Sequence, residues 1–155
     1  MIAEKDFYFH ESSRFLSAYM TGEFPLTNSP SIVPNMAIQL MPDRKYQAEY
    51  HIHYSGASTA EGISIGISGT NNAYYARGDL LINDFSKSPK VYAVTGYNQM
   101  ETNSQGDTSV ANILMNVFIV NSGQRSTLNL LAAKETAGGT ALSITRGSWV
   151  TVTEY

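Results

Sequence analysis

The segment NSGQRSTLNLLAAKETAGGTALSITRGSWVTVTEY, residues 121–155, contains three short runs in which apolar and polar residues alternate. The runs are residues 126–133, 140–145 and 148–155, and glycines stand in the turns between them. Alternation with a period of two is typical of β-strands that bury one face, and glycine supplies the positive φ angles that tight turns need. The segment therefore predicts a meander of antiparallel strands whose last member is engaged in the fold.

Further strands are predicted in the middle of the chain. Residues 46–54 place tyrosine, alanine and isoleucine on one face and Gln47, Glu49, His51 and His53 on the other. Residues 62–68 place three isoleucines on one face, whereas residues 110–120 are apolar on both faces. An antiparallel strand with solvent on one side normally alternates, so the last run implies cover on both sides. The economical source of that cover is a subunit interface, such as a trimer about a threefold axis provides.

The end of the chain resembles a known family. A leucine-rich strand, a glycine turn, an isoleucine-containing strand and a final Gly-Ser-Trp-Val-Thr-Val run are similar to the C-terminal half of TNF/C1q-like jelly rolls. The resemblance covers about residues 36–155, is strongest from Thr127 onward, and is closest to the heads that tailed phages carry on fibres, baseplates and capsid decorations. It implies an all-β antiparallel jelly-roll sandwich that forms a homotrimer. In such a trimer, the residues expected near the axis are Tyr46, Tyr50 and Phe118.

Residues 1–35 are predicted to be an anchor or connector that precedes a jelly-roll domain of residues 36–155. Residues 11–14 are a candidate start for a short helix, and the prolines at 25, 30 and 34 favour an extended connector over an interior strand. One interpretation is an anchor that docks onto a virion or a neighbouring subunit. The alternative is an ordinary first strand packed on its own barrel. The predicted anchor residues are Phe7, Phe9, Phe15 and Tyr19.

Composition excludes several classes of protein. The length of 155 residues fits one domain, and the charged fraction of 15% is below the globular average of about 25%. A net charge of -3 without a basic cluster argues against nucleic acid as a partner. The absence of cysteine excludes disulfides, zinc ribbons and thiol catalysis. No apolar run approaches a membrane span, and the first residues lack a signal-peptide pattern, so we expect no membrane partner and synthesis in a host cytoplasm.

Three motifs have a chemical reading and a structural one. His51 and His53 share a strand face and could bind one metal ion beside Glu49. We interpret them instead as part of a solvated polar face, and we expect no metal or cofactor. Arg77-Gly78-Asp79 spells an integrin-recognition tripeptide and is interpreted as a turn. The G-x-S-x-G spelling at residues 62–66 lies in a strand pattern rather than before a helix, so it does not indicate a nucleophile. No carboxylate pair is fixed at a glycosidase spacing, and we expect a protein that is not an enzyme.

A polar segment near residue 100 has a composition that suits sugar binding, with an aromatic ring among amides. The candidate glycan-binding residues are Tyr97, Asn98, Gln99 and Asn103. A solvated loop with no ligand explains the same composition.

These observations predict a structural component of a phage virion. The first hypothesis is a capsid decoration or head-fibre protein that contacts the major capsid protein. The alternative is a tail or baseplate receptor-binding head that recognises a host-surface saccharide, and an enzyme that degrades a surface polysaccharide is a third possibility. The shortness of the segment before the barrel favours the first hypothesis.

Overall fold

The computed structural model describes residues 14–56, 62–83, 90–103, 111–135 and 141–155. Every regular element in these ranges is a β-strand, so the described part of the chain has no helix that could cross a lipid bilayer. The strands are β1 (Phe15–Tyr19), β2 (Phe24–Pro25), β3 (Ser31–Ile32), β4 (Ile38–Leu40), β5 (Lys45–Gly56), β6 (Ile63–Gly69), β7 (Tyr75–Asn83), β8 (Lys90–Val94), β9 (Met100–Asn103), β10 (Ala111–Val120), β11 (Ser126–Lys134), β12 (Leu142–Ile144) and β13 (Trp149–Glu154).

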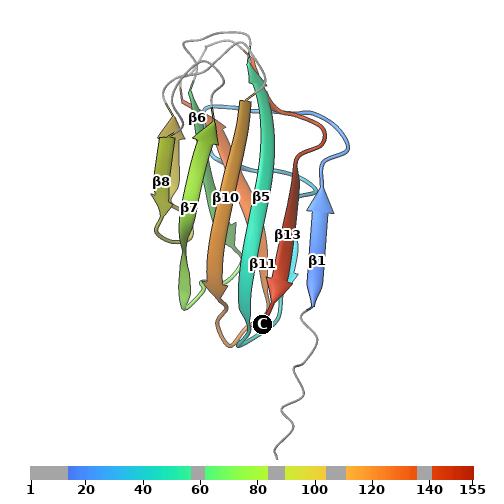
Figure 1. Ribbon diagram of the computed structural model, residues 1–155, viewed down its shortest axis with the longest axis vertical. Coiled ribbons are helices and arrows are strands. Elements are labelled where there is room, and N and C mark those ends of the chain that lie inside the picture. Colours follow the sequence, from blue (N-terminus) through green and yellow to red (C-terminus); the bar gives the residue numbers. More distant parts are fainter. Residues whose placement is uncertain (1–13, 57–61, 84–89, 104–110, 136–140) are drawn as a thin grey trace, which may run out of the picture.

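The strands form two antiparallel sheets that pack face to face (Figure 1). The larger sheet has the order β1-β13-β5-β10-β7-β8, with β12 attached to β5 and β2 attached to β12. The smaller sheet has the order β3-β11-β6-β9, with β4 also paired to β11. The predicted all-β antiparallel jelly-roll sandwich is therefore confirmed.

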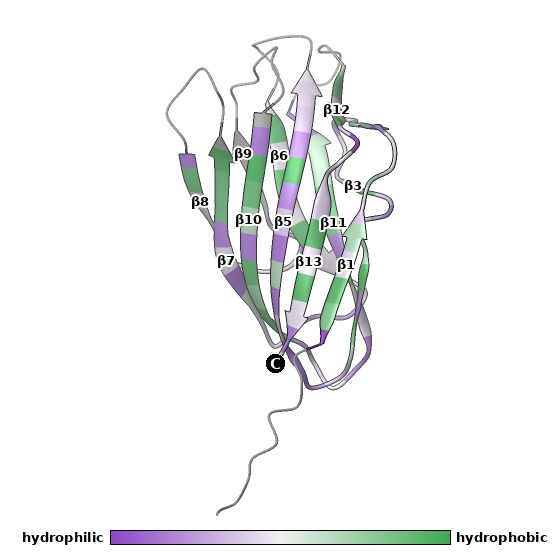
Figure 2. Cartoon of the chain, turned by 45° about the vertical axis from the view of Figure 1, so that its right-hand side comes forward, coloured by the Kyte–Doolittle hydropathy of each residue, from purple (hydrophilic) through white to green (hydrophobic). Residues whose placement is uncertain are grey.

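The core lies between the sheets and follows from alternation within each strand. In β5, every second residue from Tyr46 to Tyr54 is buried, and the residues between them are more exposed. In β10, Ile113, Met115, Val117 and Ile119 are buried in the same way. Bands of alternating hydropathy along these strands are visible in Figure 2. The smaller sheet contributes the isoleucines of β6 and, from β11, Leu128 and Leu130.

The predicted boundary at residue 36 is wrong. Strand β1 pairs with β13, from Phe15 opposite Thr153 to Tyr19 opposite Trp149. Strands β2 and β3 pair with β12 and β11. Residues 15–35 thus belong to the sandwich, because Leu16 and Ala18 pack against the core as a strand and not as the predicted helix. This agrees with the alternative of a first strand packed on its own barrel, whereas Phe7 and Phe9 lie outside the described residues.

The interpretation of Arg77-Gly78-Asp79 as a turn is also wrong. The tripeptide lies inside β7, where Gly78 pairs with Val117 of β10. Glycine is required there by close approach of the strands: a Cβ atom on Gly78 would lie 1.9 Å from the main-chain oxygen of Asn116. The glycine of this tripeptide is therefore explained by the packing of β7 against β10.

Replacing Gly78 with alanine should lower the free energy of unfolding by about 1–3 kcal/mol, because the new methyl group forces β7 away from β10. Chemical denaturation of the purified protein measures this change. Gly22→Ala is the matched control, since a Cβ atom at Gly22 meets nothing within 4 Å. Equal stability of the two variants would contradict the close approach of these strands.

Candidate functional site on the outer face of the larger sheet

One row of side chains crosses the outer face of the larger sheet from edge to edge. Strand register places them side by side, and five strand spacings make the row about 24 Å long. Leu114 at its centre is 40% exposed, and Val91 at one end is 68% exposed. We call this set the outer row: Tyr19, Trp149, His51, Leu114, Leu81 and Val91.

Two rings of the outer row stack on each other. The rings of His51 and Trp149 lie with centroids 3.7 Å apart and planes 15° from parallel. Burial lowers the pKa of His51 below its ordinary value of 6.5, and the nearby charge of Glu49 opposes part of that effect. His51 is thus a neutral, flat surface beside the indole over most of the physiological pH range.

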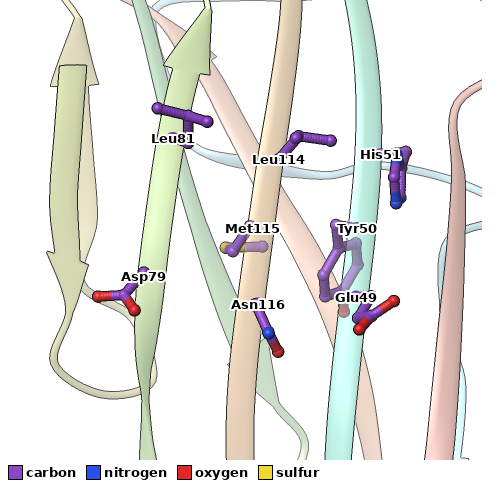
Figure 3. Close-up of a pocket in the computed structure, with 8 residues that line it drawn as sticks. All are labelled: Glu49, Tyr50, His51, Asp79, Leu81, Leu114, Met115 and Asn116. Atoms are coloured by element: carbon purple, nitrogen blue, oxygen red, sulfur yellow. The ribbon is translucent and has the colours of Figure 1, made fainter. Parts of the chain in front are cut away.

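A shallow groove of about 290 Å³ lies between β5, β10 and β7 beneath the outer row (Figure 3). Leu81, Leu114 and His51 form its apolar border. Its polar border comes from the neighbouring outward row, in which Glu49 pairs with Asn116 and Asn116 pairs with Asp79. The groove therefore combines an apolar edge with carboxylate and amide groups.

Hydrogen bonds fix the amide of the polar border. Gln47 Nε2 donates to Asn116 Oδ1 at 3.2 Å, and the Tyr155 hydroxyl donates to Gln47 Oε1 at 3.0 Å. The two carboxylates are exposed and flank Asn116 on strands that lie two spacings, about 10 Å, apart. The acid of a glycosidase pair normally lies in a poorly solvated pocket. Both carboxylates of this groove are instead exposed to solvent. With the amide of Asn116, they can form hydrogen bonds to a ligand beside an apolar surface.

Two of the three predicted trimer-interface residues lie in the core and not on the outer face. Tyr46 and Tyr50 are buried between the sheets of a single chain, at 0% and 1% exposure, so they cannot contact a partner. The Tyr46 hydroxyl accepts a hydrogen bond from Met41 N at 2.7 Å, and burial raises the pKa of Tyr50. These two assignments are corrected because the tyrosine face of β5 is the core face.

Phe118 does lie on the outer face, where it is 41% exposed. Its ring meets that of Tyr75 edge to face, with centroids 6.2 Å apart. Of the predicted anchor residues, Phe15 and Tyr19 are also outward and exposed, on edge strand β1. Tyr19 thus joins the outer row, and Phe118 lies on the same face closer to the end where β1 begins.

The predicted glycan-binding residues are only partly together. Tyr97, Asn98 and Gln99 lie between β8 and β9, but the ring of Tyr97 packs against the core, and burial raises its pKa to about 12. Asn98 adopts a left-handed φ of 61° and donates its main-chain N–H to Ile67 at 2.8 Å. Asn103 ends β9, and its side chain lies outside the described residues.

The rings of His51 and His53 contact different residues. His51 stacks on Trp149, whereas the His53 ring contacts Asn112 Oδ1 through Nδ1. Across the described ranges, no three His, Asp or Glu side chains are grouped to hold a metal ion.

The outer row itself was not predicted from the sequence. Its members come from six strands, and only the pairing register brings them together. A local signal existed for Leu114, because apolar residues on both faces of residues 110–120 indicated a second contact surface.

Replacing Trp149 with alanine should raise the pKa of His51 toward 6.5, because the indole is removed from one face of the imidazole. NMR titration of the histidine rings measures it, and Trp149→Phe, which keeps a ring, is the control. Because the folded pKa is below the unfolded one, the free energy of unfolding should fall as pH decreases through 6.5 and level off below the folded pKa. An unchanged His51 pKa in Trp149→Ala would contradict this account.

No protein-family model and no curated protein sequence matches the chain. Among solved structures, Eiger TNF from S. frugiperda is similar in fold, with 10% identity, a TM-score of 0.46, and coverage of 91% of this chain and 92% of that chain. A family two carbohydrate esterase from Cellvibrio japonicus is similar at 12% identity and a TM-score of 0.29, and this chain spans 35% of it. A structure of infectious bursal disease virus, Gx strain, is similar at 12% identity and a TM-score of 0.27, with 39% of that chain covered. The part of the chain that the structure describes is an all-β, two-sheet antiparallel jelly-roll sandwich.

Proposed function

We propose that this chain is a non-enzymatic structural protein of a bacteriophage virion, a capsid decoration or head-fibre protein that forms a homotrimer. The outer row carries the proposal. Three of its six side chains, Tyr19, Leu114 and Val91, are exposed, and the other three are half-buried. Large exposed side chains that lie in one row on a sheet are characteristic of a surface that meets another molecule. The resemblance of residues 127–155 to phage jelly-roll heads supports a second and third copy as that molecule.

The chemistry of the outer face suits a contact between copies. Tyr19, Trp149 and Leu114 supply the aromatic and aliphatic surface that is enriched at interface centres. Glu49, Asp79 and Asn116 lie in the next row and place polar groups beside it. The outer face therefore has an apolar centre with a polar margin, as subunit interfaces have.

The positions of the two chain ends suit attachment to a particle. Glu154 N donates to Arg14 O at 2.9 Å, so the described chain begins and ends at the same end of the sandwich (Figure 1). In the proposed arrangement, residues 1–13 attach this end to the capsid or to another virion protein. The opposite end then points away from the particle.

A tail or baseplate receptor-binding head is the second candidate. The groove favours it, because Glu49, Asp79 and Asn116 offer hydrogen bonds beside Leu81 and Leu114, as saccharide sites do. An enzyme acting on a surface polysaccharide is a third candidate, for which loss of polymer viscosity on incubation is the test. The exposed carboxylates of the groove favour binding over hydrolysis.

Substitution of Leu114 by aspartate should convert the trimer to monomers, because it places a charge at the centre of the outer row. Size exclusion coupled to light scattering measures the mass. Ile32→Asp is the matched control, since Ile32 is an exposed apolar residue of the smaller sheet and should leave the trimer intact. A monomeric parent protein would contradict the proposed trimer. A dimer would keep the outer row as the subunit interface, but with twofold instead of threefold symmetry.

Antibodies raised against the purified protein should label the capsid surface of the virions that encode it, as seen by electron microscopy. Labelling at the tail tip would favour the receptor-binding candidate instead. Virions without label and without the protein in their mass spectra would overturn a virion role altogether.

A further inference from the structure

A second concave surface lies at the edge of the larger sheet, where β8 separates from β7. Pairing of these two strands ends at Gly78 and Val94, so the first residues of β7 have no described strand neighbour on that side. The resulting cleft has a volume of about 390 Å³. We call this surface the edge cleft. Its lining is mainly polar and aromatic and includes Tyr74, Tyr75, Arg77, Asn72, Thr95 and Tyr97.

Two tyrosine rings border the edge cleft and are exposed. Tyr74 is 71% exposed and Tyr75 is 46% exposed, although both are large apolar rings. Contacts elsewhere hold them in place. The Tyr74 hydroxyl accepts a hydrogen bond from Gly123 N at 3.3 Å, and Tyr75 packs edge to face on Phe118. Rings that are exposed yet held by neighbours are suited to stacking on a flat ligand.

Arg77 places a positive charge in the lining of the cleft, beside the Tyr75 ring. Its guanidinium carbon lies 5.8 Å from the centre of the Tyr75 ring. Arg77 forms no ion pair with any residue in the described ranges. The charged neighbour on its own strand face is Asp79, two positions along β7. An unpaired guanidinium beside aromatic rings is preorganised for a planar anion such as a carboxylate.

We propose that the edge cleft binds an acidic saccharide, with the sugar ring against Tyr74 and Tyr75 and its carboxylate on the Arg77 guanidinium. The amide of Asn72 and the exposed Thr95 supply polar groups for the sugar hydroxyls. The predicted glycan segment touches this cleft only through Tyr97, whose half-buried ring forms part of its wall. This binding site does not depend on the virion role or on the trimer.

The lining favours a saccharide over a peptide. A peptide added to the open edge of β7 would need apolar pockets for alternate side chains. Most of the cleft surface is polar, and two of its three aromatic residues, Tyr74 and Tyr75, are exposed. Charge selects the acidic class, because Arg77 is the charged residue among those that line the cleft.

The test uses the full chain with oligogalacturonate, which carries a carboxylate on every ring, and its methyl ester as the uncharged probe with the same sugar rings. Calorimetry should show binding of the acid form and at least tenfold weaker binding of the ester. Arg77→Gln should weaken binding of the acid by about tenfold to a hundredfold, as expected for loss of a charge-assisted contact. Arg146→Gln, which removes an exposed arginine outside the cleft, should leave binding unchanged.

Tyr74→Ser is a second variant and should weaken both probes by about fivefold through lost stacking. Backbone NMR shifts on adding the acid should centre on residues 72–77 and 95–97. Three results would overturn the proposal: no binding of the acid, equal binding of acid and ester, or shifts centred outside the edge cleft. In the first of these cases, binding of poly-glutamate would indicate strand addition by an acidic peptide instead.

Discussion

The pairing register of β5 determines most of this structure. This twelve-residue strand pairs with β10, β12 and β13, so its alternation sets which side chains of three neighbours face the core. A slip by one residue would exchange Tyr50 for His51 in the interior and leave five apolar side chains in solvent. The buried tyrosines of β5 therefore select the register, and the outer row is the consequence on the opposite face.

Local periodicity was sufficient to predict the strands of the core, whereas the two-sheet class of fold was predicted from the family resemblance. The strands at residues 46–54, 62–68, 110–120 and 126–133 all lie close to their predicted positions. The misassigned segments share a physical cause, which is that their partners are distant in sequence. Strand β1 pairs with β13, and Gly78 is explained by Asn116 of β10. Neither relation has a signature within the segment itself.

The candidate site was less predictable than the fold. Phe118 was predicted near a trimer axis and Tyr19 in an N-terminal anchor, and both lie on the outer face. Tyr46 and Tyr50 were wrongly predicted at a trimer interface. Alternation within a strand defines two faces, but it does not show which of them is buried in the core. Trp149, His51 and Leu81 become one surface only through three separate pairings. The edge cleft likewise exists because β8 leaves β7, which the sequence does not mark.

The pairing of β1 with β13 has a consequence for the order of folding during synthesis. Phe15 and Thr153 are neighbours in the sheet but lie almost a whole chain apart in sequence. Strand β1 therefore cannot pair until β13 has been synthesised. Contacts of such long sequence separation also form slowly. Until then, Phe15, Leu16 and Tyr19 are apolar groups without their strand partner. A newly made chain therefore passes through an interval in which these apolar groups are open to contacts with neighbouring chains.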